Sequence, residues 1–363
     1  MRIAFDVGNI DIRNGGVAPY AERLLTAFQD YPDSSFNITM VKGECPVAMP
    51  KRRSWRRRRK STTDWEKDSR VWKHFDVYHS PSQIVRSQDI PWIVTMHDVQ
   101  ELHFPEYFSS ADREFRAVYH RQVIENANAV VVSFDHVRED LIRFFDIPGE
   151  RIHTIPLPMS YCGLPEVDEH ETLQTRKRLG LPERYVVYPA QTWPHKNHIG
   201  LLKALLELRE RGNRIDLICT GHVNDFFDDS LRPFIEEHAM QDQVHMLGSL
   251  STEDLAVAYK SSRALVIPTK YEAGSFPLIE AMLMRQPVIC ARTTSLPATI
   301  ESEEFVFDAD DSSAMANLIE KIVDDSDFRD RSISNSVSVT KDWHSINIAE
   351  RYHKLWNYVF GSS

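Results

Sequence analysis

The chain has 363 residues, which is long for one domain and sufficient for two. Hydrophobic residues make up 42% and charged residues 26%, as in globular proteins, and the net charge of −10 argues against general nucleic-acid binding. No apolar run approaches the roughly 18 to 20 residues of a membrane-spanning helix. The amino terminus lacks a signal-peptide core and the four cysteines are scattered, so we expect a cytoplasmic protein with reduced thiols.

Strand-like and helix-like segments alternate through the first half of the chain. The apolar run Ile3–Val7 is followed by Gly15-Gly16 and by apolar residues at helical spacing from Val17 to Phe28. Such alternation predicts βαβ units around a parallel sheet. Further runs that predict buried strands are Phe75–Tyr78, Trp92–Met96 and Ala129–Val132.

One segment of this half departs from the acidic average, because eight of the ten residues from Lys51 to Lys60 are cationic. The sequence leaves three interpretations: a solvated loop, a surface for anionic lipid headgroups, or a nucleic-acid patch, which nothing else in the chain supports. At a membrane each basic residue contributes about 1 kcal/mol, and tryptophan adds an interfacial anchor. The residues of this predicted membrane or acceptor surface are Arg52, Arg53, Trp55, Arg56, Arg57, Arg58 and Arg59.

The same alternation restarts after an irregular stretch, residues 156–171, which we interpret as a linker. A helix is expected where leucines recur between residues 201 and 208, and an amphipathic helix from Ile348 to Val359 ends the chain. The second half therefore predicts another α/β domain. Its predicted strands are Tyr185–Tyr188, Ile215–Cys219, Val244–Leu247, Ala264–Ile267 and Pro287–Cys290.

An acidic motif follows the fourth of these strands. Glu272 and Glu280 are separated by seven residues, and Pro277 between them favours a helix start because proline is tolerated in a first turn. Backbone N–H groups at Gly274 and Ser275 would then point at a helix entry that favours anions. A carboxylate on each side of an anion pocket suits a nucleotide sugar, whose diphosphate lies between two hydroxyl-rich rings.

This motif resembles the Glu-x7-Glu signature of retaining glycosyltransferases of family 4, which have the GT-B fold of two Rossmann-like domains with parallel sheets facing across a cleft. The resemblance implies that Glu280 binds the nucleotide ribose and that Glu272 lies beside the donor sugar. It also implies that main-chain N–H groups hold the phosphate and sugar, and these belong to Gly274, Ser275 and Phe276.

The resemblance covers nearly the whole chain and implies its domain organisation. Residues 1–162 would form the acceptor-side Rossmann-like domain and residues 163–340 the domain that binds the nucleotide sugar. Residues 341–363 would carry a C-terminal helix that crosses back to the first domain.

A second motif, Trp193-Pro-His-Lys-Asn-His198, leads into the first helix of the second half. Lys196 at this helix start can place an ammonium group on a diphosphate. Family members commonly carry an Arg and a Lys five residues apart here; Lys196 matches the Lys, whereas Gln191 stands at the Arg position. The motif resembles a subgroup rich in mannosyltransferases of bacterial surface polysaccharide assembly, which implies GDP-mannose as the donor.

Four more positions match the family pattern. His97 follows the strand Trp92–Met96 and would lie near the donor sugar, so the resemblance assigns catalysis to His97, Glu272 and Lys196. The other matches are Gly16 in the glycine-rich first loop, Gly221 in a cleft-edge turn, and Leu250, whose main chain would meet the nucleobase.

No metal or other cofactor is expected. Asp308-Ala-Asp310 resembles the metal site of another glycosyltransferase fold, but it occurs late in the chain, where helix capping explains it. The expected partners are a nucleotide-sugar donor, a glycan or lipid-linked acceptor and an anionic membrane surface, without nucleic acid. These partners imply a peripheral location on the inner membrane face.

The sequence therefore predicts a retaining hexosyltransferase that moves mannose from GDP-mannose onto a lipid-linked or oligosaccharide acceptor in surface polysaccharide biosynthesis. The alternative is a GT-B-like sugar-nucleotide epimerase or binding protein without transferase activity. Release of free sugar or epimer in the absence of an acceptor would favour this alternative.

Overall fold

A computed structural model describes residues 1–8, 16–32, 35–42, 45–47, 69–85 and 89–362. The chain divides into two compact units, the first formed by Met1–Tyr161 and Asn347–Ser363 and the second by Cys162–Ile346. The chain thus passes from the first unit to the second after residue 161 and returns after residue 346. The sequence had suggested these boundaries after residues 162 and 340.

The first unit is built on a seven-stranded sheet of order β3-β2-β1-β4-β5-β6-β7, in which only β3 is antiparallel to its neighbour. Its strands are β1 (Arg2–Asp6), β2 (Asn37–Lys42), β3 (Cys45–Val47), β4 (Val77–Ser80), β5 (Trp92–Thr95), β6 (Ala129–Val132) and β7 (Ile152–Thr154). Its α-helices are α1 (Val17–Asp30), α2 (Gln100–His103), α3 (Ser110–Asn126), α4 (Asp135–Phe145) and α13 (Ile348–Gly361).

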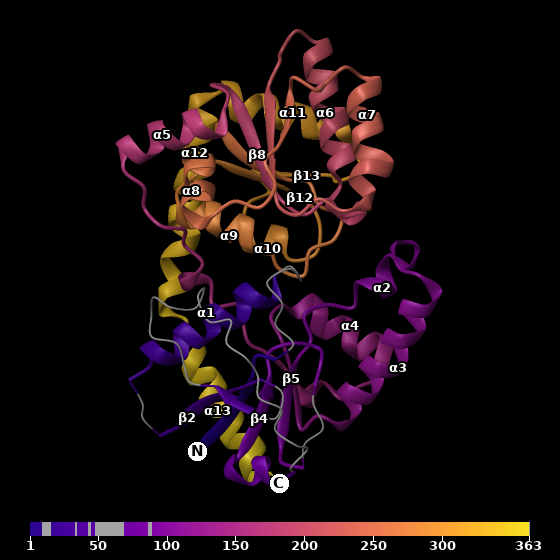
Figure 1. Cartoon of the computed structure of the whole chain (residues 1–363), viewed down its shortest axis with the longest axis vertical. Helices are drawn as coiled ribbons and strands as arrows, with labels where there is room; N and C mark the ends of the chain where they lie inside the picture. The colour runs from indigo at the N-terminus through magenta and orange to yellow at the C-terminus, as the bar shows by residue number, and fades with distance from the viewer. Residues whose placement is uncertain (9–15, 33–34, 43–44, 48–68, 86–88, 363) are drawn as a thin grey trace. The chain divides into compact units, whose positions relative to one another are not determined.

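Helices cover both faces of this sheet, which explains why its central strands β4 and β6 are buried at every residue. Helices α1 and α13 pack together on one face, and α3 and α4 lie on the other (Figure 1). Trp356 of α13 is fully buried, and its ring centroid lies 5.0 Å from that of Phe28 on α1. The C-terminal helix is therefore part of the core of the first unit.

The second unit contains a six-stranded parallel sheet of order β10-β9-β8-β11-β12-β13. Its strands are β8 (Tyr185–Pro189), β9 (Asp216–Thr220), β10 (Val244–Met246), β11 (Ala264–Ile267), β12 (Val288–Ala291) and β13 (Val306–Phe307). Its α-helices are α5 (Glu169–Leu179), α6 (His198–Glu210), α7 (Arg232–Glu237), α8 (Thr252–Lys260), α9 (Phe276–Leu283), α10 (Leu296–Ile300), α11 (Ser312–Asp324) and α12 (Ser326–Thr340).

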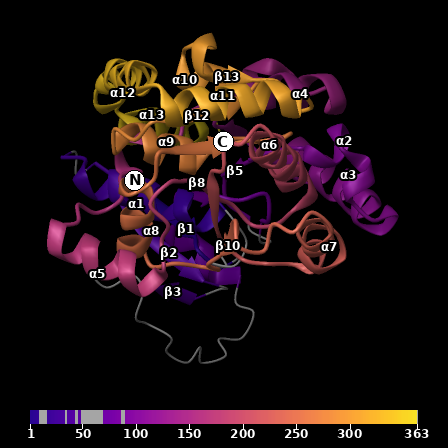
Figure 2. The ribbon, with the colours of Figure 1, turned by 90° about the horizontal axis from the view of Figure 1, so that it is seen from above.

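Helices also enclose this second sheet. Helices α6 and α7 lie on one side of β8 and α8 on the other (Figure 2), α11 packs on α6, and α12 packs on α9. Both units are thus Rossmann-like, as predicted. In such sheets ligands bind at the carboxyl edge where the strand order reverses, which is between β1 and β4 in the first unit and between β8 and β11 in the second.

Candidate functional site

Lys196 and Glu272 meet at the point of the second sheet where the strand order reverses. Lys196 follows β8, Glu272 follows β11, and these two strands are parallel neighbours. The Nζ atom of Lys196 lies 2.6 Å from Oε2 of Glu272, and the two side chains are only 19% and 16% exposed. The structure therefore brings together two of the three predicted catalytic residues, whereas His97 belongs to the first unit.

The loop that carries Lys196 is tied to the strands around it. The Tyr188 hydroxyl donates to the main-chain oxygen of Lys196 over 2.9 Å. Asn197, in the left-handed region at φ 58°, donates from Nδ2 to the carbonyls of Pro268 and Ala309. Because Pro268 directly follows β11, this amide fixes the Lys196 loop against the loop that leads to Glu272.

Two histidines flank Lys196 and remain neutral near pH 7. Burial, and then the nearby Lys196 charge, lower the pKa of both His195 and His198 to about 3. Burial raises the pKa of Tyr188 well above its usual value, and the nearby Glu272 carboxylate adds to this effect. The positive charge of this loop therefore resides on Lys196.

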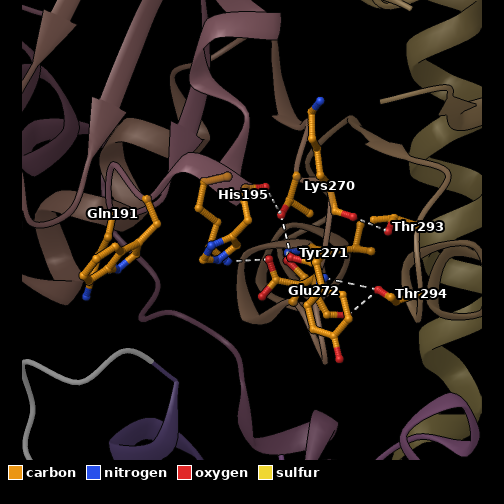
Figure 3. A network of polar contacts seen from close by, with 12 residues as sticks. Gln191, His195, Lys270, Tyr271, Glu272, Thr293 and Thr294 are labelled. Atoms are coloured by element: carbon orange, nitrogen blue, oxygen red, sulfur yellow. Dashed lines mark hydrogen bonds and ion pairs between the residues drawn. The ribbon is translucent and has the colours of Figure 1, made fainter. Parts of the chain in front are cut away.

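Hydroxyl groups from the loop after β12 hold the Glu272 segment from the opposite side (Figure 3). Thr293 Oγ1 donates to the Lys270 carbonyl over 2.8 Å. Thr294 Oγ1 donates to the Glu272 carbonyl and accepts from its N–H at 3.3 Å, and Ser295 Oγ reaches the same carbonyl at 3.3 Å. Sequence reasoning missed these residues, although three consecutive hydroxyl side chains after a strand gave a signal.

Helix α9 begins at Phe276, as predicted, with Pro277 in its first turn. Ser275 is the N-cap, and its Oγ accepts from the N–H of Leu278 at 3.4 Å. The N–H groups of a first helical turn lack intrahelical acceptors and carry a partial positive charge, which favours an anion. Gly274, Ser275 and Phe276 therefore all stand at the helix entry where they were expected.

Glu280 lies in the second turn of α9 and is only 7% exposed. The hydroxyl of Tyr259, on α8, donates to its Oε2 at 3.2 Å. The carboxylate is thus anchored inside the unit, and its assignment to a ribose stays a prediction.

Two glycine turns adjoin the site at the carboxyl edge. Gly221, after β9, donates its N–H to the carbonyl of Gly248, after β10, over 2.8 Å. Gly221 has φ +117°, and a Cβ there would lie 2.8 Å from the Ala190 carbonyl, so a larger residue does not fit. Leu250 is partly buried just before α8, and its contact with a nucleobase stays a prediction.

Gln191 lies on the same loop as Lys196, immediately after β8. The indole Nε1–H of Trp193 donates to its Oε1 over 2.8 Å, and the Trp193 side chain is 47% exposed. Gln191 thus offers an amide where the family commonly has a guanidinium, so it brings no charge to a diphosphate.

In the first unit, His97 follows β5 and is partly buried. Its Nε2 lies 2.9 Å from the Pro81 carbonyl, and its ring lies 4.9 Å from the Tyr20 ring. A carbonyl only accepts, so Nε2 carries the proton and Nδ1 of the neutral ring is an acceptor. Burial lowers the pKa of His97 and favours this neutral form. Gly16 is exposed at the start of α1.

The predicted membrane or acceptor surface lies outside the described residues. It comprises Arg52, Arg53, Trp55, Arg56, Arg57, Arg58 and Arg59. Among the helices that the structure describes, none combines the length and apolar character needed to cross a bilayer.

Comparisons with known proteins identify relatives of this chain. Residues 171–338 match the family of glycosyl transferases group 1, and residues 42–158 match the glycosyl transferase 4-like domain. The O-antigen chain mannosyltransferase B of Escherichia coli is 30% identical over 254 residues, or 69% of this chain and 66% of that relative. The match thus spans just under two thirds of the relative's length.

Two solved structures show the same fold over the whole chain. Sucrose-phosphate synthase from Thermosynechococcus elongatus has a TM-score of 0.73 at 18% identity, with all of both chains covered. Anabaena HepE, solved with UDP and glucose, has a TM-score of 0.71 at 15% identity, covering 99% of this chain and 100% of HepE. The fold class is therefore GT-B, as predicted.

Proposed function

Because this chain belongs to the glycosyl transferases group 1 family, we propose that it transfers mannose from GDP-mannose to a glycan or lipid-linked acceptor. The transfer would retain the anomeric configuration and would serve the synthesis of a surface polysaccharide. The relative named as an O-antigen chain mannosyltransferase supports mannose as the sugar and a surface polysaccharide as the product. The observation that carries the proposal is the Lys196–Glu272 pair, 2.6 Å apart, beside the first turn of α9.

Each group of this site has a role that its chemistry supports. As the bond to the sugar breaks, negative charge develops on the leaving diphosphate, and the Lys196 ammonium and the α9 N–H groups would stabilise it. The sugar becomes oxocarbenium-like, and the Glu272 carboxylate would accept hydrogen bonds from its hydroxyls. The acceptor hydroxyl would then attack the face that the diphosphate leaves and give its proton to an oxygen of that diphosphate, so that the anomeric configuration is retained. In the first unit, Nδ1 of His97 is the acceptor for a sugar hydroxyl.

We also propose that transfer needs no metal ion. Lys196 and the amino-terminal end of α9 provide positive charge for the diphosphate, the task that a divalent cation performs in many phosphate-binding enzymes. Activity is expected to persist in excess EDTA. Loss of activity that Mg²⁺ or Mn²⁺ restores would contradict this proposal.

A peripheral membrane location is proposed for the protein. Eight cations within residues 51–60 provide charge for anionic headgroups, and a lipid-linked acceptor resides at such a surface.

The donor is tested by a thermal-shift screen against GDP-, UDP-, dTDP- and ADP-sugars, followed by a transfer assay with the sugars that bind. GDP-mannose is expected to raise the melting temperature most. Binding accompanied by epimer or free sugar, and no transfer to any acceptor, would favour the epimerase or binding-protein alternative.

The site is tested by Lys196→Ala and Glu272→Ala. Each is expected to lower transfer by about 10²-fold or more, because each removes charge or positioning at the reacting centre, while the fold persists. Glu350→Ala and Lys354→Ala are matched controls, since these residues form an exposed ion pair of 2.7 Å on α13. Full transfer by either site variant would remove the assignment.

A further inference from the structure

Thr294 has a backbone conformation that β-branched residues rarely adopt. Its φ is +43°, in the left-handed region, and it follows β12 by three residues. Such a conformation costs free energy and persists only where surrounding contacts stabilise it. The contacts that hold Thr294 therefore identify what the conformation achieves.

Both hydrogen bonds of the Thr294 side chain are made with Glu272. Thr294 Oγ1 donates to the Glu272 carbonyl and lies 3.3 Å from the Glu272 nitrogen, so one hydroxyl bonds to both polar groups of that residue's main chain (Figure 3). Ser295 Oγ lies 3.3 Å from the same carbonyl. Thr294, in its strained conformation, thus holds the main chain of Glu272 by hydrogen bonds from the neighbouring loop.

These hydrogen bonds matter because Glu272 lies on an irregular loop, between β11 and α9. No strand or helix of its own fixes where its carboxylate points. Its Oε2 is nonetheless 2.6 Å from Lys196 Nζ. Catalytic groups need placement to within a fraction of an ångström, and small displacements cost large factors in rate.

We propose that Thr294 is a positioning residue: its hydroxyl fixes the main chain of Glu272 so that the carboxylate reaches both Lys196 and the hexose of the donor. This inference rests on the proposed function of the site, because it assumes that the Glu272 carboxylate contacts the hexose.

The test separates positioning from folding by comparing Thr294→Gly, Thr294→Val and Thr294→Ser. Glycine accepts the positive φ and removes the hydroxyl, so the melting temperature should stay within about 2 °C of the wild type. Valine keeps the shape of the threonine side chain and removes the hydroxyl, whereas serine keeps the hydroxyl and removes the methyl group. Thr340→Val is the matched control, because Thr340 Oγ1 also donates to a main-chain carbonyl, that of Ser336, at 2.8 Å within α12.

Two readouts are expected to change together in the variants that lack the hydroxyl. The kcat for transfer from GDP-mannose should fall about 10- to 100-fold. The affinity for GDP-mannose relative to that for GDP should fall about tenfold, the worth of one hydrogen bond to a charged group. Thr294→Ser and Thr340→Val should stay within about twofold of the wild type in both measurements.

The possible outcomes are distinct. A Thr294→Gly or Thr294→Val enzyme with wild-type kcat and wild-type relative affinity overturns the positioning role. Activity that merely follows the melting temperature across the series also overturns it. If the wild type binds GDP and no nucleotide sugar at all, the proposed function fails, and this inference fails with it.

Discussion

Lys196 and Glu272 form an ion pair between two groups that we assign to different parts of one donor. A diphosphate bound to the Lys196 ammonium competes with the Glu272 carboxylate, which lies 2.6 Å from Nζ. Both side chains are more than four-fifths buried, so water screens this competition only weakly. On the proposed assignment, the pair would therefore weaken phosphate binding while it places the carboxylate for the hexose.

Removing the charge of Glu272 should separate these two effects. Glu272→Gln is expected to bind GDP about tenfold more tightly, about 1.4 kcal/mol, while transfer falls. Isothermal titration calorimetry with GDP measures the first effect and a transfer assay the second. Glu350→Gln, which neutralises the exposed partner of Lys354, should change neither. Unchanged or weaker GDP binding by Glu272→Gln would show that the pair does not compete with phosphate.

At the scale of elements, α13 completes the core of the first unit through aromatic contacts. The ring of His79, on β4, stacks on that of Tyr352 with centroids 5.1 Å apart, and Trp356 lies 5.9 Å away. His79 is fully buried, and among the described residues neither ring nitrogen has a hydrogen-bond partner. Burial consequently lowers the pKa of His79 to about 3.

This burial makes the first unit sensitive to acid. Since the ordinary pKa is 6.5 and the folded value about 3, the unfolded chain binds the proton first as pH falls, and stability is lost between these values. His79→Phe keeps a stacked ring and removes the titration. Between pH 7 and pH 5 the variant should lose about 2 kcal/mol less free energy of unfolding than the wild type, measured by urea denaturation.

The matched control for this measurement is His170→Phe, which alters an exposed histidine on α5 of the second unit. It should lose stability between the two pH values as the wild type does. If His79→Phe and the wild type lose the same free energy of unfolding, protonation of the His79 ring between β4 and α13 does not cause the loss of stability in acid.

At the scale of the whole molecule, charge is distributed unevenly along the chain. The net charge is −10, yet eight of the ten residues from Lys51 to Lys60 are cationic. An acidic protein is repelled by anionic bilayers, so a local cationic segment would have to carry any attraction to them.

Vesicle co-sedimentation tests this attraction. Replacing Arg57, Arg58 and Arg59 by Gln should weaken binding to anionic vesicles by about 3 kcal/mol at low salt, at about 1 kcal/mol per charge. The control replaces Arg176, Lys177 and Arg178 by Gln, another run of three cations, on α5. If both triple variants and the wild type bind equally, the segment from Lys51 to Lys60 is a solvated loop and the membrane proposal is wrong.

Local patterns predicted much of the fold. Apolar runs indicated most strands of both sheets, because strands covered on both faces are rich in apolar residues. Pro277 marked the start of α9 correctly. The predicted linker ended too late, since Asp168 and Glu171 form a capping box that begins α5. The N-cap of α11 is Asp311, one residue after the Asp308-Ala-Asp310 motif to which the capping had been assigned.

Tertiary structure alone decided how the site is assembled. Lys196 and Glu272 are 76 positions apart and meet because β8 and β11 pair where the strand order reverses. The hydroxyl of Thr294 reaches Glu272 only because β12 lies beside β11. Local patterns specified most of the helices and strands, since capping and burial patterns act over a few residues. Strand pairing joins distant segments and leaves no local pattern, so it alone determined which side chains share a site.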